Sequence, residues 1–140
     1  MVAWQSREED GTGVYSRLHG ERFSWLGSPL GDEFLIGATG GTINEVDVVA
    51  QRLSARTVVS WHRTVFEGSQ MDHDLVARLL DGTGSFVDDM FVVTDKQLAV
   101  HQAACPFADG SFLIFWEGNY PGGRGIFAQR FDADGNKLYH

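Results

Sequence analysis

Residues 112–135 read FLIFWEGNYPGGRGIFAQRFDADG, and this stretch decides the fold class. An apolar run ends at Trp116, a glycine-rich gap follows, and a second run alternates apolar and polar residues as a half-buried strand does. The same plan recurs in residues 1–20, MVAWQSREEDGTGVYSRLHG, and in residues 57–82, TVVSWHRTVFEGSQMDHDLVARLLDG. Their first runs end at Trp4 and Trp61. The three Trp residues stand at nearly equal intervals along the chain, which indicates an internal repeat.

The rest of the chain consists of short runs rich in Val, Leu and Phe, bounded by Gly, Asp or Ser, and this pattern predicts an all-β protein. Matched between repeats, the runs form a unit of four antiparallel strands, A to D. Strand A is predicted at 45–54 and 100–109, strand B at 1–4, 57–63 and 112–118, strand C at 13–19, 74–80 and 125–131, and strand D at 32–40 and 88–96. Residues 71–82 also have spacing that suits a helix face. Their counterparts carry strand-forming residues, so we predict a strand.

Four antiparallel strands in a repeat of about 50 residues predict a β-propeller blade better than a solenoid coil or a sandwich. The repeat segments, approximately 1–40, 41–96 and 97–140, contain strands B-C-D, A-B-C-D and A-B-C. This single domain is therefore predicted to be a partial β-propeller of ten strands, about two and a half blades. An open ring leaves unpaired backbone groups at both ends, so we expect self-association through open blade edges or a place in a longer protein.

Strand C can be aligned across the three repeats without a gap, and this alignment matches Arg17 with Arg78. The interval from Trp to the start of strand C is longer in the middle repeat than in the other two, so the middle repeat has four extra residues between strands B and C. Insertions of this kind fall in exposed loops. The matched sets are Gly13, Asp74 and Gly125; Tyr15, Val76 and Phe127; and Arg17, Arg78 and Gln129.

Composition and charge restrict the classes of partner. The 140 residues are 43% hydrophobic, which is enough for the core of one domain. A net charge of −8 with 11 scattered Lys and Arg residues argues against nucleic acid. No apolar stretch approaches the roughly 18 to 20 residues that cross a bilayer, and MVAWQSREED has no signal-peptide pattern, so no membrane segment is expected. The single Cys105 is expected to be a small buried strand residue rather than a reactive thiol.

Residues 107–138, FADGSFLIFWEGNYPGGRGIFAQRFDADGNKL, and VYSRL at 14–18 resemble the repeats of large bacterial secreted and surface proteins. Those repeats have the form ADG-x-F-V-V-x-W followed by G-I-Y-A-Q-R-F-D-x-x-G-N. The middle repeat keeps Ala77, Asp81 and Gly84 of this pattern. The layout is also similar to that of Asp-box and sialidase-like propellers. The resemblance implies a propeller in an extracellular or cell-surface protein, used for adhesion or ligand display without a uniform enzymatic activity.

Trp4, Trp61 and Trp116 recur at one position of the repeat and are the first candidates for ligand binding. A Trp ring is a platform for the apolar face of a sugar, and the alternative is that each ring fills the gap between neighbouring blades. We therefore expect a non-catalytic binding or structural module whose ligand is a carbohydrate or a protein surface. A purely structural, self-assembling repeat unit is a further alternative.

A sialidase-like glycosidase is the enzymatic alternative that the resemblance implies. It needs an arginine cluster for a carboxylate, a tyrosine nucleophile and an acid. Arg17 and Arg78 match each other and are candidate ligand-binding residues, but the third repeat has Gln129. Tyr15 has no tyrosine at the matched positions of the other repeats. No enzyme is therefore predicted unless additional blades or partner chains complete a site.

Asp132, Asp134 and Asn136 are the candidate metal ligands, because oxygen ligands at positions 1, 3 and 5 begin a calcium-binding loop. Gly135 stands at position 4 of this run rather than at position 6. The alternative is a turn between strands, which favours the same residue types because Asp, Gly and Asn tolerate positive φ. No cofactor other than calcium is expected.

Met71, Asp72, His73 and Asp74, with His62 close in sequence, form a further candidate for metal binding or acid–base chemistry. Neighbours on an extended chain point to opposite sides, so Asp72 and Asp74 share a face that excludes His73. A solvated loop in the middle repeat is the alternative. The sequence has no nucleophile elbow, HExxH, phosphate loop or Cys/His metal pattern.

Overall fold

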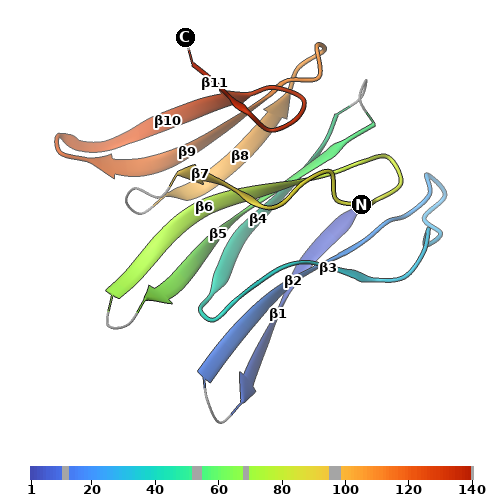
Figure 1. Ribbon diagram of the computed structural model, residues 1–140, viewed down its shortest axis with the longest axis horizontal. Helices are drawn as coiled ribbons and strands as arrows, with labels where there is room; N and C mark the ends of the chain where they lie inside the picture. The colour runs from blue at the N-terminus through green and yellow to red at the C-terminus, as the bar shows by residue number, and fades with distance from the viewer. Residues whose placement is uncertain (11–12, 52–54, 68–69, 95–98, 140) are drawn as a thin grey trace.

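The computed structural model describes residues 1–10, 13–51, 55–67, 70–94 and 99–139, which form eleven β-strands (Figure 1). The strands are β1 (Val2–Asp10), β2 (Gly13–Glu21), β3 (Phe34–Thr39), β4 (Ile43–Ala50), β5 (Thr57–Glu67), β6 (Gln70–Leu80), β7 (Phe91–Thr94), β8 (Val100–Pro106), β9 (Phe112–Tyr120), β10 (Gly123–Phe131) and β11 (Lys137–Leu138). The all-β prediction is confirmed. None of the described residues forms a helix that is long and apolar enough to cross a membrane. The ends of the predicted strands 45–54 and 88–96 lie outside the described residues.

The strands make three antiparallel sheets, each a meander within one repeat segment. Sheet I has the order β1-β2-β3, sheet II the order β4-β5-β6-β7, and sheet III the order β8-β9-β10-β11. Most of the segment 71–82 lies in β6, so the strand prediction for it is confirmed. The short β11 begins a fourth strand on sheet III, which gives one strand more than the ten predicted. Within the described residues, none of the three sheets closes on itself.

Sheet II lies between sheets I and III (Figure 1), and β4 and β8 contact each other along one edge. One apolar cluster joins sheets I and II, and a second joins sheets II and III. Consecutive side chains of a strand point to opposite faces, so Val58 enters the second cluster and Val59 the first. The middle sheet is therefore buried on both sides, which explains the consecutive apolar residues Val58-Val59 in β5 and Leu79-Leu80 in β6.

The two clusters hold the core of the molecule. The buried residues of the first are Leu18, Ile36, Ile43, Val59, Trp61, Val76 and Leu80. Those of the second are Val58, Leu75, Ala77, Leu79, Val93, Ala99, Phe112, Ile114 and Phe131. Each cluster combines residues from two sheets that are distant in sequence, so the packing between sheets, more than any one sheet, stabilises the fold.

The same five-residue turn follows strand C of the repeat in all three sheets. It occupies residues 24–28, 81–85 and 132–136, and in each the N–H of the first residue donates to the carbonyl of the fifth. The fourth residue is always glycine, and Gly27, Gly84 and Gly135 have φ of 83°, 89° and 87°. This left-handed conformation is accessible to glycine without strain. A turn of the same geometry at 107–111, with Gly110 at φ of 84°, joins β8 to β9, so it is the place of a turn after strand C that marks equivalent positions in the three sheets.

The strand register corrects the gap-free alignment of strand C. The cross-strand pairs are Trp4 with His19, Trp61 with Val76 and Trp116 with Phe127. The distance in sequence from Trp to its partner is thus the same in sheets I and II and shorter by four residues in sheet III. His19, not Tyr15, is the equivalent of Val76 and Phe127. The middle repeat therefore has no insertion relative to the first. The hairpin of β9 and β10 in sheet III is instead shorter by four residues than the other two hairpins.

Two irregularities support this register. The pairing of β2 with β3 shifts after Leu18, and the pairing of β6 with β7 shifts after Leu75, at the position that the new register makes equivalent. The alignment from sequence was wrong by four residues because an even shift keeps every side chain on its face, so alternation is the same in both registers. The available signal was Arg-Phe at 22–23 ahead of turn 24–28, matching Arg-Phe at 130–131 ahead of turn 132–136.

Gly37 in β3 allows Trp61 to pack closely between sheets I and II. A Cβ at Gly37 would lie 2.8 Å from the Trp61 Cζ2 atom, whereas a Cβ at Gly40 would meet nothing within 4 Å. We expect Gly37→Ala to lower the free energy of unfolding by about 1–3 kcal/mol, because the core must shift to admit the methyl group. Gly40→Ala is the matched control and should change it by less than about 0.5 kcal/mol. Urea denaturation of both variants measures the difference, and equal midpoints would contradict the close approach.

Candidate functional site

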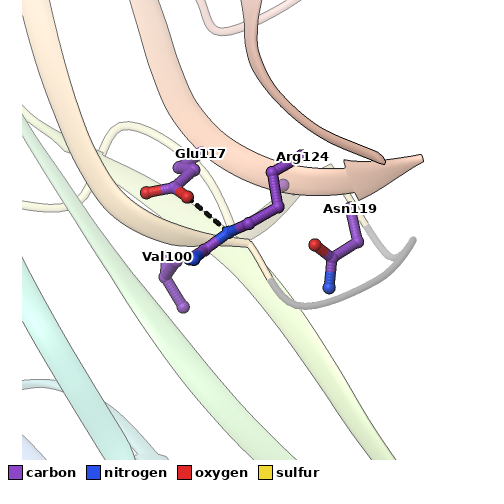
Figure 2. Close-up of a pocket in the computed structure, with 5 residues that line it drawn as sticks. Val100, Glu117, Asn119 and Arg124 are labelled. Carbon is purple, nitrogen blue, oxygen red and sulfur yellow. Dashed lines mark ion pairs between the residues drawn. The ribbon is translucent and has the colours of Figure 1, made fainter. Parts of the chain in front are cut away.

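A pocket of about 340 Å³ lies on sheet III, where β8 meets the hairpin of β9 and β10 (Figure 2). Its lining residues are Val100, Glu117, Gly118, Asn119 and Arg124. The Nε atom of Arg124 is 2.6 Å from the Oε1 atom of Glu117, so an ion pair lies inside the pocket. The Arg124 side chain is 68% exposed. Its guanidinium is thus accessible to a bound molecule.

The hairpin sequence positions these polar groups. Gly123 has φ of 124°, which glycine adopts readily, and the next residue, Arg124, pairs with Asn119 across the hairpin. Glu117 pairs with Ile126 on one side and with Val100 on the other. Residues that are paired across strands point to the same face, so the lining side chains converge on one side of sheet III.

Two equivalent β-bulges connect the pocket to sheet II. Glu45 in β4 and His101 in β8 have positive φ, 51° and 54°, at the places where the pairing of each strand with its neighbour is interrupted. A residue other than glycine in this conformation costs about 1–3 kcal/mol, and such residues concentrate at functional sites. The two bulged residues also touch: the backbone N–H of His101 donates to the Glu45 carboxylate.

Glu45, His101, Glu117 and Arg124 form a continuous polar chain, the sheet-edge cluster. The Nδ1 atom of His101 is 3.1 Å from Glu117 Oε2, and its Nε2 atom is 3.9 Å from Glu45 Oε1. The chain thus runs from the edge strand β4 of sheet II through β8 to β9 and β10 of sheet III, and its carboxylates alternate with an imidazole and a guanidinium. Sequence reasoning missed all four residues, because no motif or spacing marks two bulges that belong to different repeat segments.

The three repeated Trp residues do not converge on this pocket. Trp61 is 1% exposed and lies in the core between sheets I and II, so it has the packing role that was the alternative to sugar contact. Trp116 packs against the core between sheets II and III and stacks on Phe127 at 6.2 Å. Trp4 stacks on His19 at 5.8 Å on the outer side of sheet I. None of the three lines the pocket.

Arg17 and Arg78 are not brought together. The register makes Arg17 equivalent to Asp74 and Arg78 equivalent to Glu21, which corrects their alignment with each other. The guanidinium of Arg17 is 2.9 Å from Glu8 across the first hairpin. Arg78 donates to the carbonyl of Ile36 in sheet I, and its guanidinium lies 3.4 Å over the Phe86 ring. Burial lowers the pKa of Arg78 below its ordinary value. Arg78 thus joins sheets I and II.

Asp132, Asp134 and Asn136 make the hydrogen bonds of a turn. The Oδ1 atom of Asp132 accepts the backbone N–H groups of Asp134 and Asn136, both at 2.9 Å, and Oδ2 accepts the Asn136 amide. The Asn136 amide and these N–H groups lower the pKa of the Asp132 carboxyl. Asp134 pairs with Arg56 at 2.8 Å. In the part of the chain that the structure describes, no group of three or more His, Cys, Asp or Glu side chains is placed to hold a metal ion.

Residues 71–74 belong to β6, so their interpretation as a loop was wrong. The pairing of β5 with β6 continues to Gln70, beyond this segment. Asp74 accepts two hydrogen bonds from Arg63, at 3.0 and 2.8 Å. His73 lies on the opposite face, as alternation predicted, and stacks on His62 with ring centroids 5.4 Å apart. The segment therefore holds a partly buried ion pair and a histidine pair on separate faces.

His62 is buried, and its Nε2 atom has no hydrogen-bond partner among the described residues. Burial, and next the charge of His73, lower the pKa of His62 below its ordinary 6.5, against the opposing effects of Glu45 and Asp74. The unfolded chain therefore binds a proton that the folded chain binds less readily. We expect the free energy of unfolding to fall as the pH drops through about 6.5, by at most about 1.4 kcal/mol per pH unit for one proton.

His62→Gln removes the titrating group from this position and should flatten the pH dependence between about pH 7 and 5.5. Urea denaturation at several pH values measures the slope for both proteins. An unchanged slope would show that another group causes the loss of stability in acid.

Cys105 lies in β8 and is exposed, so the expectation of a buried residue was wrong. Its Sγ atom is 3.9 Å from the carbonyl of Pro106. Cys105 pairs with Leu113, whereas its neighbour Ala104 pairs with Ile114 and packs against the cluster between sheets II and III. Alternation therefore points the Cys105 side chain to the opposite, open face of sheet III.

No family model, curated protein or solved structure matches this chain. The resemblance to bacterial propeller repeats accordingly rests on the sequence motifs alone. The sheet-edge cluster and the pocket beside it are the features from which a function can be inferred.

Proposed function

We propose that the three sheets are successive blades of a partial β-propeller. Four-stranded antiparallel meanders are the units of this architecture, and the neighbouring first strands β4 and β8 lie side by side as inner blade strands do. Both junctions between sheets are also built alike. Each has an apolar cluster, and each has a guanidinium that donates to the turn of the next sheet, from Arg22 to turn 81–85 and from Arg56 to turn 132–136.

The proposed function is non-catalytic binding of a carbohydrate at the sheet III pocket, within a bacterial secreted or surface protein that serves adhesion. The pocket carries this proposal, because Glu117, Asn119 and Arg124 offer acceptors and donors in about 340 Å³, near the lower limit of small-molecule sites. Sugar hydroxyl groups both donate and accept, and charged partners give the stronger hydrogen bonds. A protein surface as ligand would instead need roughly 800 Å² of contact on this chain.

A glycan array followed by calorimetry tests the proposal. The chain should retain one class of glycan, and Arg124→Ala should weaken its affinity by roughly tenfold or more, because a charged hydrogen-bond partner is lost. The matched control is Arg7→Ala. It removes another exposed guanidinium that pairs with a glutamate, in sheet I instead of sheet III and on the face of β1 opposite Trp4.

The control should bind as the unaltered chain does. Retention of no glycan, or equal losses in the two variants, would contradict carbohydrate binding at this pocket. Incubation with aryl glycosides tests the alternative that the module is a glycosidase. Release of the reporter would show that the module is catalytic.

A further inference from the structure

The sheet stack has two open faces, one on sheet I and one on sheet III (Figure 1). Each sheet has two faces. In sheet II, Val59 and Trp61 lie on one face, and we call this face and its equivalents in the other sheets the Trp face. Leu75 lies on the opposite face of sheet II, and we call this face and its equivalents the reverse face. Inside the chain, the reverse face of one sheet packs on the Trp face of the next. Among the described residues, no further sheet covers the Trp face of sheet I or the reverse face of sheet III.

The register identifies the equivalent residues on these faces. The Trp-face pairs are Val2 and Trp4 in sheet I, Val59 and Trp61 in sheet II, and Ile114 and Trp116 in sheet III. The reverse-face position is Leu18 in sheet I, Leu75 in sheet II and Ile126 in sheet III. All three sheets thus carry apolar residues at the same places, whether or not a neighbour covers them.

Exposure separates the covered faces from the open ones. Leu18 packs with Val59 in one cluster and Leu75 with Ile114 in the other, and all four are fully buried. At the open faces, Val2 is 53% exposed and Ile126 is 74% exposed. Apolar side chains therefore reach solvent at the two places where the repeat packs its next sheet, whereas the equivalent side chains inside the chain are buried.

The positions of the polar groups in the junction between sheets I and II also recur at the two open faces. Arg22 of sheet I donates to two carbonyls of turn 81–85 in sheet II. The residue of sheet III equivalent to Arg22 is Arg130, and the turn of sheet I equivalent to 81–85 is 24–28. Arg130 pairs with Asp109 and Ser111 within sheet III, so only its position at one open face, and that of turn 24–28 at the other, repeat the two halves of this contact. The two open faces are complementary in their apolar positions.

We propose that the reverse face of sheet III binds the Trp face of sheet I in a second copy of this chain. The occupant is a second copy because one chain carries both halves of a junction that it already forms twice within itself. The proposal rests on the propeller arrangement above. Two copies bring six sheets, within the four to eight blades of propellers, whereas three copies bring nine, so the ring closes as a dimer.

The new junction adjoins the pocket. Ile126 pairs with Glu117 across β9 and β10, so a second copy that covers Ile126 forms one wall of the Glu117 and Arg124 site. Because a shielded ion pair interacts more strongly with a bound molecule than an exposed one does, dimer formation and ligand binding are coupled.

Sedimentation across a dilution series tests the dimer. The measured mass should be twice the 15.5 kDa of one chain. Ile126→Asp and Val2→Arg, each alone, should raise the dimer dissociation constant roughly tenfold or more, because each places a charge in an apolar junction. The control Met71→Asp alters an exposed apolar residue on the middle sheet and should leave the dimer mass unchanged.

A mixture of Ile126→Asp and Val2→Arg gives a sharper result. A head-to-tail ring of the two variants has one unaltered junction and one in which Asp faces Arg, so the mixture should form the dimer that neither variant forms alone. A monomer at all concentrations, an open polymer, or no recovery in the mixture would overturn the proposal. Glycan retention is measured separately. A dimer that retains no glycan contradicts only carbohydrate binding. A monomer that retains a glycan contradicts only the closed ring.

Discussion

Replacing Trp61 by alanine should lower the free energy of unfolding by about 3–5 kcal/mol, the cost of emptying a buried aromatic site that collapses only in part. The ring is 1% exposed and is held between sheets I and II, where Gly37 leaves room for its edge. Deleting it opens a cavity at the centre of the first cluster. Because this cluster holds sheet I against sheet II, the amide protons of sheet I should exchange faster than those of sheet III.

Trp25→Ala is the matched control, because Trp25 is 91% exposed and belongs to neither core cluster. Its effect should stay within about 0.5 kcal/mol. Urea denaturation followed by circular dichroism compares the two variants, and hydrogen exchange locates the loosened sheet. A small effect at Trp61 would mean that sheets I and II are not joined through this residue.

The strands were predictable from sequence because a meander of paired strands needs only local patterns. Alternating residues in 123–131 and the turn glycine at 135 define a strand and its end without knowledge of the neighbouring sheets. The consecutive apolar residues Val58 and Val59 are also a local pattern, that of a strand buried on both faces. Each of these features depends only on which face of one strand is buried.

The register of strand C was not predictable from alternation. A shift of four residues leaves each side chain on its face, so Arg17 and Arg78 matched by pattern although they lie at different levels of their hairpins. Residues 71–74 were misread for a related reason. The second hairpin continues beyond them, and nothing local distinguishes a long polar hairpin arm from a loop.

The candidate site was the least predictable feature. Glu45 and His101 meet because two bulges with positive φ lie on the adjacent edge strands β4 and β8, and neither residue type indicates that conformation in sequence. The contact depends on how sheets II and III pack, which is long-range information. The repeated Trp residues were candidates for ligand binding because they recur periodically. At Trp61 this periodicity reflects a packing position of the repeat.

Phe131→Ala should lower the free energy of unfolding by about 3–5 kcal/mol through the other junction. Phe131 is fully buried, stacks on Phe112 with centroids 5.1 Å apart and contacts the Phe91 ring at 5.3 Å. Phe91 belongs to sheet II and Phe112 to sheet III, so the ring of Phe131 connects the two sheets. Aromatic pairs add about 0.5–1.5 kcal/mol each beyond the area they bury.

In Phe131→Ala, the amide protons of sheet III should exchange faster than those of sheet I, the opposite of the result expected for Trp61→Ala. Amide protons of β9 and β10 should exchange before those of β1 and β2, because the first cluster, which holds sheet I, is intact. Phe107→Ala is the control: its ring is exposed and lies under the Arg130 guanidinium at 4.8 Å, so the loss should stay below about 1 kcal/mol. If either core variant loosens both end sheets together, the two clusters act as one unit, and the fold is not a series of separable junctions.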